Sequence, residues 1–152
     1  MSARERFHNV DGMNNFNTLQ WPLIIGLGAF ALIRPLVRVV EHQLGADMGV
    51  AAPIILTVLI SVVWVAVVGF SKARHPVLTL LFTGLIYAVL SIILSGILSP
   101  ILDGRLEGPL ANPIAIVPVL LINAAWGLAA GGLALLTQRL RGIKSADPKE
   151  LP

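Results

Sequence analysis

The sequence predicts an all-α fold, a polytopic membrane protein built as a bundle of four transmembrane helices. Composition, the length of the apolar stretches and the placement of prolines support this prediction. Of the 152 residues, 56% are hydrophobic and only 12% are charged, whereas a soluble domain carries about 25% charged residues. The mean hydropathy is +0.84. Because so little polar surface is available to face water, the bilayer is the solvent that suits this chain.

Four apolar stretches are long enough to cross a hydrocarbon core of roughly 30 Å, which takes about 20 helical residues. They are residues 21–40, 50–70, 76–98 and 113–136. Each has a proline in or near its first turn, where the amides have no partner within the helix. These prolines are Pro22, Pro53, Pro76 and Pro113.

Two of the predicted spans carry boundary signals, and short connections of residues 41–49, 71–75 and 99–112 join the spans. Asn112 is predicted to cap the fourth helix. Ser99 and Pro100 are predicted to end the third, because proline cannot continue the hydrogen-bond ladder of a helix.

Basic residues predict a multi-pass protein of the plasma (cell inner) membrane with both termini in the cytoplasm. With four spans, both ends and the 71–75 connection share one side of the membrane. That side carries Arg4, Arg6, Lys72, Arg74, Arg139, Arg141, Lys144 and Lys149. The other side has only Arg34, Arg38 and Arg105, so the positive-inside rule gives the orientation.

The sequence divides into three parts around this membrane domain. Residues 1–20 form a polar segment, either a short helix at the headgroups or a loosely ordered tail. Residues 21–138 form the four-helix domain, and residues 139–152 form a basic tail predicted to be disordered. Residues 59–64 (LISVVW) resemble residues 121–126 (LINAAW), which leaves a parallel duplication of two helical hairpins as an open alternative.

Arg34 and Arg38 are the main candidate site, because ionisable groups within spans are costly and need a partner or a function. They lie four residues apart, and therefore on one helix face. Pro35 is expected to kink this helix and to leave the carbonyl of Ala31 without its usual partner. We favour a structural cluster of ion pairs that holds down the 99–112 connection, with Glu41, Asp47, Asp103 and Glu107 as the acidic partners on the outer side. The alternatives are an anion or lipid-headgroup site and arginines that snorkel to the interface.

The third span carries a row of hydroxyl groups at every fourth residue. Its members are Thr79, Thr83, Tyr87, Ser91, Ser95 and Ser99. Small residues of the fourth span, above all Gly127 and Gly131, allow a helix backbone to approach closely. We interpret this pair of faces as helix packing or an oligomer interface, with Ser and Thr bonding their own helix. A hydroxyl-lined path for a small solute is the alternative.

Near mid-depth, three different helices carry Ser61, Tyr87 and Asn123. An amide in lipid needs partners, so Asn123 is expected to face the bundle interior or another subunit. If the three converge below Arg34, they form a polar pocket lined by Trp64 and Trp126.

The sequence argues against several chemistries. No span has a central carboxylate, no basic run is interleaved with aromatic residues, and no nucleotide-binding or hydrolase motif occurs. The chain has no cysteine, and its three histidines lie apart without zinc-ligand spacing. We therefore expect no catalytic residues, no cofactor, no metal and no nucleic acid.

Two functional classes remain at this point. The favoured hypothesis is a non-catalytic subunit, scaffold or helper of a larger membrane assembly, because buried ionisable groups are scarce. The alternative is a small homo-oligomeric transporter or channel for an anion or a weakly polar solute. In either case the expected partners are the lipid bilayer and a second copy or another membrane protein, since four spans enclose only a narrow cavity.

Overall fold

The computed structural model describes residues 19–45 and 49–142, and every secondary-structure element in these ranges is helical. The α-helices are α2 (Trp21–Phe30), α3 (Ile33–Leu44), α4 (Ala51–Phe70), α5 (Pro76–Asp103) and α6 (Ile116–Leu140). Two 3₁₀ turns, η1 (Gly108–Leu110) and η2 (Pro113–Ala115), connect α5 to α6. The expectations for residues 1–18 and 143–152 lie outside the described residues.

Four helical stretches are long and apolar enough to cross a membrane, which indicates a multi-pass membrane protein. They are Trp21–Leu44, Ala51–Phe70, Pro76–Asp103 and Pro113–Leu140. In the most apolar window of each, at most 28% of the residues are buried inside the chain. Large apolar side chains such as Ile114 (83% exposed) and Ile122 (67% exposed) point outward. This is the pattern of helices whose outer faces need an apolar solvent.

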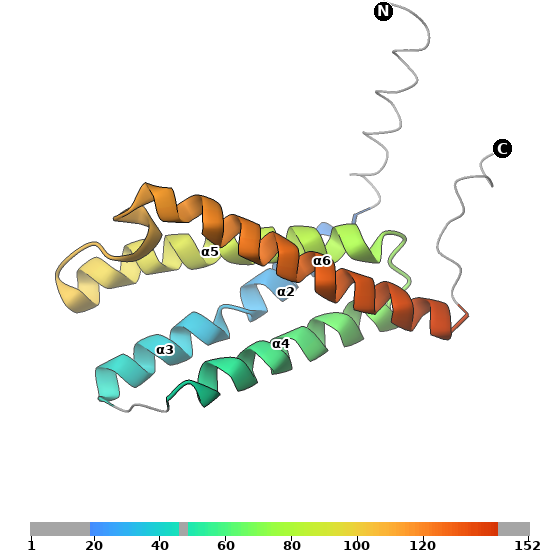
Figure 1. Cartoon of the computed structure of the whole chain (residues 1–152), viewed down its shortest axis with the longest axis horizontal. Helices are drawn as coiled ribbons and strands as arrows, with labels where there is room; N and C mark the ends of the chain where they lie inside the picture. The colour runs from blue at the N-terminus through green and yellow to red at the C-terminus, as the bar shows by residue number, and fades with distance from the viewer. Residues whose placement is uncertain (1–18, 46–48, 143–152) are drawn as a thin grey trace, which may run out of the picture.

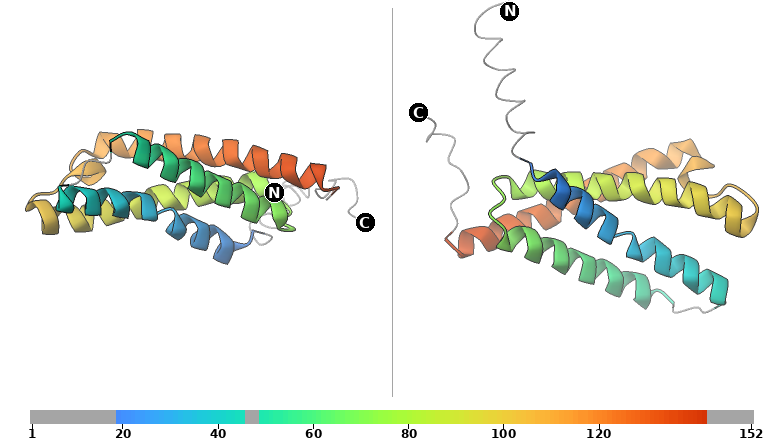
Figure 2. Two further views of the ribbon diagram at one scale, coloured as in Figure 1. Left: turned by 90° about the horizontal axis from the view of Figure 1, so that it is seen from below. Right: turned by 180° about the vertical axis from the view of Figure 1, so that it is seen from behind.

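The helices run lengthwise side by side (Figures 1 and 2), with α5 packed along α6, α2 against α5, and α4 against α6. The described chain begins at the end of the bundle that holds the 71–75 connection and the end of α6; we call it the proximal end. The other end, with the end of α3 and the α5–α6 connection, is the distal end. The core is concentrated toward the proximal end, where Ile24, Val68, Leu80 and Ala134 are fully buried.

Glycines bring α5 and α6 together. A Cβ atom added at Gly127 would collide with the main-chain oxygen of Leu80, and one at Gly84 with that of Asn123. At Gly131 an added Cβ would lie 2.7 Å from the Cα of Val77. At Gly127 and Gly131, α6 is therefore packed against α5 of the same chain.

The first span is broken, and the break lies just before Pro35. Helix α2 ends at Phe30, Ala31 and Leu32 form a turn, and α3 starts at Ile33. The Ala31 carbonyl lacks its usual partner four residues on, as expected, and the Arg34 N–H donates to that oxygen instead, at 3.2 Å. Without an amide at Pro35, the chain tightens to a three-residue hydrogen bond, and no freed backbone carbonyl remains at Ala31.

Two predicted helix boundaries are wrong. Helix α5 continues through Ser99 and Pro100 and ends at Asp103, where Gly104 adopts a left-handed conformation (φ 68°). A glycine in this conformation is the stronger stop signal, because it needs no side-chain clearance. At the start of the fourth span, the Asn112 side chain caps nothing, and a 3₁₀ turn precedes α6.

The proximal end of α4 is held by side chains from α6. The fully buried Gln138 points its Nε2 at the carbonyl oxygens of Val68, Ser71 and Ala73, at 3.1, 3.2 and 3.2 Å. Arg141 donates to the Gly69 oxygen at 3.3 Å, and its guanidinium lies 4.5 Å from the ring centroid of Phe70. The last carbonyls of a helix lack donors within the helix, and Gln138 and Arg141 supply such donors to the end of α4 and to the connection that follows it.

Candidate functional site: a cationic cleft

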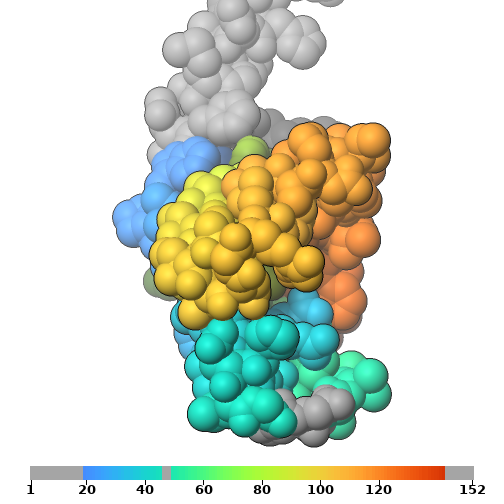
Figure 3. Space-filling view, turned by 90° about the vertical axis from the view of Figure 1, so that its left-hand side faces the viewer, coloured from blue at the N-terminus to red at the C-terminus, as the bar shows by residue number. Residues whose placement is uncertain are grey.

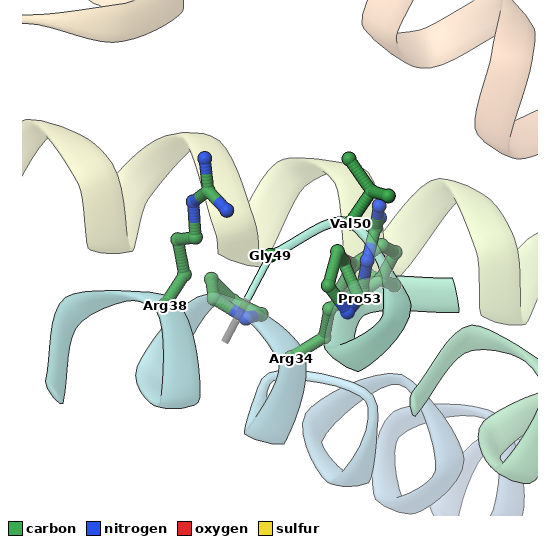
Figure 4. Close-up of a pocket in the computed structure, with 7 residues that line it drawn as sticks. Arg34, Arg38, Gly49, Val50 and Pro53 are labelled. Atoms are coloured by element: carbon green, nitrogen blue, oxygen red, sulfur yellow. The ribbon is translucent and has the colours of Figure 1, made fainter. Parts of the chain in front are cut away.

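A cleft of about 660 Å³ lies between α3, the start of α4 and the middle of α5. Its lining is Arg34, Pro35, Arg38, Gly49, Val50, Pro53 and Tyr87. Figure 4 shows that the side chains of Arg34 and Arg38 rise from the same side of α3. The break after α2 creates this space, because α2 packs against α5 whereas α3 stands beside α4 with few contacts.

Neither Arg34 nor Arg38 forms an ion pair or a hydrogen bond through its side chain within the described part of the chain. The pairing of these arginines with Asp103 and Glu107, favoured from the sequence, is therefore wrong, and the suggested partner Asp47 lies outside the described residues. Asp103 instead lies 3.5 Å from His42 Nε2, and Glu107 accepts a 2.6 Å hydrogen bond from Arg105. The physical reason is the extra length of α5, which carries Asp103 level with the end of α3, one turn beyond Arg38.

The distal connection is held down without these arginines. The Glu107 main-chain N–H donates to the hydroxyl of Ser99 at 3.0 Å. Leu110 also packs onto α5 where Gly96 leaves room. Figure 3 looks onto this end, with the end of α3 below α5 and the α5–α6 connection. Because Asp103 and Glu107 are paired elsewhere, the connection does not neutralise the positive charges of Arg34 and Arg38.

A second, smaller pocket of about 190 Å³ shares Arg34 and Tyr87 with the cleft. All four spans contribute to it. Its remaining lining is Ala31, Thr57, Ile60, Trp64, Ile122, Asn123 and Trp126. The structure thus brings Arg34, Tyr87 and Asn123 together with both tryptophans, as the sequence suggested. Ser61 itself does not line this pocket and instead lines a neighbouring one, although its hydroxyl accepts a hydrogen bond from Trp126 of the inner pocket.

Several polar groups of this inner pocket already donate hydrogen bonds to protein oxygens. Trp64 Nε1 donates to the Leu27 oxygen at 3.1 Å, and Trp126 Nε1 to the Ser61 hydroxyl at 3.0 Å. Asn123 Nδ2 and Thr57 Oγ1 donate to carbonyls one turn back, at 2.8 and 2.7 Å. The donors left for a ligand are the guanidinium of Arg34 and the hydroxyl of the half-buried Tyr87, which both pockets share, and the second N–H of Asn123.

The hydroxyl row of the third span is explained mainly by local bonds. Thr79 and Thr83 are buried and donate to carbonyls four residues back, at 2.9 and 2.8 Å. Ser91 donates to the Ala88 oxygen at 2.9 Å, and Ser95 lies against Gly108 of the connection. These four groups serve the helix and its packing and line none of the pockets described above. Tyr87 is the member of the row that lines the cleft and the inner pocket.

The two residue blocks of the suspected repeat occupy dissimilar places. Trp64 is 2% exposed and bonds to α2, whereas Trp126 is 47% exposed and bonds to Ser61 of α4. One hairpin contains a broken helix with few contacts to its mate, and the other contains the tightest helix pair of the bundle. The similarity of the two blocks therefore does not extend to their surroundings.

Sequence reasoning missed the role of Gln138, which stands between Thr137 and Arg139 at the end of a span and has no distinguishing signal in the sequence. Glu41 was expected only as a partner of the arginines. Glu41 lies one turn beyond Arg38 on α3; it is 8% exposed, and its Oε1 has no hydrogen-bond partner. Among the described residues, no group of three or more His, Cys, Asp or Glu side chains is placed to hold a metal ion.

The arrangement is suited to binding an anion. Two guanidinium groups offer planar arrays of donors, and the Tyr87 hydroxyl adds another. No protein-family model, no curated protein and no solved structure was found to match this chain.

Proposed function

We propose that this chain is a four-span protein of the plasma membrane whose N- and C-terminal ends face the cytoplasm. The helical pattern and the exposed apolar faces support membrane insertion. The orientation rests on the surplus of Lys and Arg at the proximal end. Under this proposal the cleft opens toward the outer side of the membrane, and the well-packed proximal core faces the cytoplasm.

The absence of cysteine makes this orientation easy to test. Single cysteines replace the exposed residues Leu106 and Lys72, which lie on opposite sides of the proposed membrane. A membrane-impermeant maleimide added to intact cells should label Leu106→Cys and spare Lys72→Cys until the cells are broken. The reverse labelling pattern would overturn the orientation.

We further propose that the protein is a non-catalytic membrane component, a helper or subunit, that holds an anionic group at Arg34 and Arg38. The observation that carries this proposal is a cleft of about 660 Å³ lined by two arginines whose side chains have no ion pair or hydrogen bond with any described residue. An uncompensated charge within an apolar span is costly, and a bound anion removes that cost. Arginine suits phosphate and carboxylate, because its guanidinium binds them through two parallel hydrogen bonds.

Anion binding is tested on the purified protein in nanodiscs made of a zwitterionic lipid. Microscale thermophoresis would follow titration with inorganic phosphate and with a phosphate ester. We expect saturable binding that Arg34→Gln abolishes, whereas Arg105→Gln in the connection leaves it intact. Binding that is equal in all three proteins would refute the site.

A transporter for such an anion is the second candidate function. It is favoured by one observation, the contrast between the cleft at the distal end and the buried core at the proximal end. A carrier that alternates access looks like this in one of its two states. Anion flux into proteoliposomes, lost in Arg34→Gln, would support it, whereas binding without flux would favour the helper.

The partners are also part of the proposal, since four spans form a thin unit. Native mass spectrometry of protein extracted in mild detergent would reveal them. A second chain in the spectrum supports the subunit role. A small integer multiple of 16.2 kDa would support the homo-oligomeric transporter.

A further inference from the structure

We propose that the ligand of the cleft is an anionic phospholipid, with its phosphate at Arg34, Arg38 and Tyr87 and an acyl chain in the inner pocket. This inference rests on the proposed anion site and specifies its ligand. It starts from the shape of the site, because Arg34 and Tyr87 line both the cleft and the inner pocket. A molecule bound to these two residues can therefore place one part in the cationic cleft and another part in the inner pocket.

The inner pocket is suited to hydrocarbon. The indole nitrogens of Trp64 and Trp126, and the amide nitrogen of Asn123, already donate to protein oxygens. The two indoles therefore present mainly ring surface to the pocket, next to Ile60 and Ile122, while the Asn123 amide adds one polar group to this apolar lining. A free inorganic anion gains nothing from such a surface, whereas each buried CH₂ of an acyl chain contributes about 0.8 kcal/mol.

The cleft is suited to a phosphate headgroup. Arg34 and Arg38 extend from the same side of α3 (Figure 4), and one turn of helix separates them by about 6 Å along the axis. Arg38 is the residue nearer the distal end of the span, and a long basic side chain there reaches the headgroup level. Tyr87 faces them from α5, and its hydroxyl makes no hydrogen bond within the described structure.

A bilayer lipid also has a route into the site. Helix α3 makes few contacts with α4 and is not packed along α5, so the helices that line the cleft are loosely joined at α3. Apolar residues at the surface of α3 and α4, such as Leu36 and Ile54, are exposed next to this opening. A lipid can therefore enter laterally with its chain still in hydrocarbon, which avoids transfer through water.

The test counts the lipids retained by the full chain. Nanodiscs contain phosphatidylcholine with a minor share of phosphatidylglycerol, and native mass spectrometry measures the lipid that stays bound after release. We expect phosphatidylglycerol to be enriched over its bulk share by about tenfold or more, the size of one charge-assisted hydrogen bond. The double variant Arg34→Gln/Arg38→Gln should lose the enrichment, and Arg34→Lys/Arg38→Lys should keep part of it.

A second pair of variants tests the acyl-chain compartment and leaves both arginines in place. Ile122→Trp adds bulk to the wall of the inner pocket, whereas Leu121→Trp adds the same bulk at an exposed neighbour that lines neither compartment. We expect Ile122→Trp to reduce phosphatidylglycerol retention and Leu121→Trp to leave it unchanged. Equal retention in both would overturn the amphiphile proposal.

Inorganic phosphate distinguishes this inference from the anion site on which it rests. If millimolar phosphate displaces phosphatidylglycerol fully and binds equally well to Ile122→Trp, the anion site stands and the lipid proposal falls. If the double glutamine variant retains phosphatidylglycerol as well as the native chain does, both proposals fall. Weak displacement by phosphate, together with the loss in Ile122→Trp, supports the lipid.

Discussion

The indole nitrogen Nε1 of Trp64 donates a 3.1 Å hydrogen bond to the main-chain oxygen of Leu27, which also accepts the amide of Ala31 at 3.2 Å. Trp64 is almost completely buried, so this bond ties α4 to α2 in a place that water does not reach. It lies one turn before the break of the first span. The bond therefore holds the end of α2 in place, directly before the break after which α3 diverges from α5 and leaves room for the cleft.

Trp64→Phe is expected to destabilise the protein by about 1 kcal/mol, the usual net value of one hydrogen bond. The phenyl ring keeps most of the packing, and the Leu27 oxygen keeps its helical bond. Thermal unfolding in detergent measures the change. Trp126→Phe serves as the control and should cost less, because Trp126 is 47% exposed and Ser61 retains its bond to the Thr57 oxygen. An equal loss in both variants would contradict this ranking.

Gln138→Leu is expected to cost about 1–3 kcal/mol, because it removes the donor shared by buried carbonyls. The Val68 oxygen keeps its 2.8 Å bond from the Ser71 hydroxyl, so the cost falls on the oxygens of Ser71 and Ala73. The midpoint of denaturant unfolding reports the loss. Leu140→Ala, at a position 81% exposed, is the matched change on the same helix and should be close to neutral.

Gly127→Ala is expected to destabilise the α5–α6 pair by about 1–3 kcal/mol, the typical cost of overpacking. The added methyl group meets the main chain at Leu80, which cannot move without shifting α5. Gly132→Ala provides the comparison on the same helix, because nothing lies within 4 Å of its added Cβ. There alanine should be neutral, or stabilising by up to about 1 kcal/mol through its better helix propensity. The two melting temperatures should move in opposite directions or differ clearly; identical values would show that α5 and α6 do not pack in this way.

Pro35→Ala is expected to close the cleft. It restores an amide that can bond to the Ala31 carbonyl, so that α2 and α3 can join into one helix that continues along α5. Spin labels on cysteines at Leu44 and Leu106 would measure the separation of α3 from the α5–α6 connection. We expect a shorter distance and weaker phosphate binding in Pro35→Ala than in the native sequence. An unchanged distance would show that the proline is not what holds the break open.

The features set by short-range rules could be predicted from the sequence. The four spans follow from apolar run lengths, because a run of about 20 residues is needed to cross the hydrocarbon core. Pro22 and Pro76 do lie in the first turns of α2 and α5. The position of Arg34 and Arg38 on one helix face also follows from spacing alone, and so does a disturbance of the helix near Pro35. The predicted end of α5 at Ser99 and Pro100 is wrong, because the left-handed Gly104 ends the helix and Pro100 does not.

Only the tertiary structure decided which groups meet. Gln138 and the carbonyl of Val68 are 70 residues apart in the chain, and Trp126 and Ser61 are 65 apart. Asp103 lies next to His42, and not next to Arg34 or Arg38, because of where α3 and α5 end. In a soluble protein, the alternation of polar and apolar residues would reveal the inner face of each helix. Here lipid and protein interior are equally apolar, so the sequence carries no such signal and the faces are fixed by packing between helices.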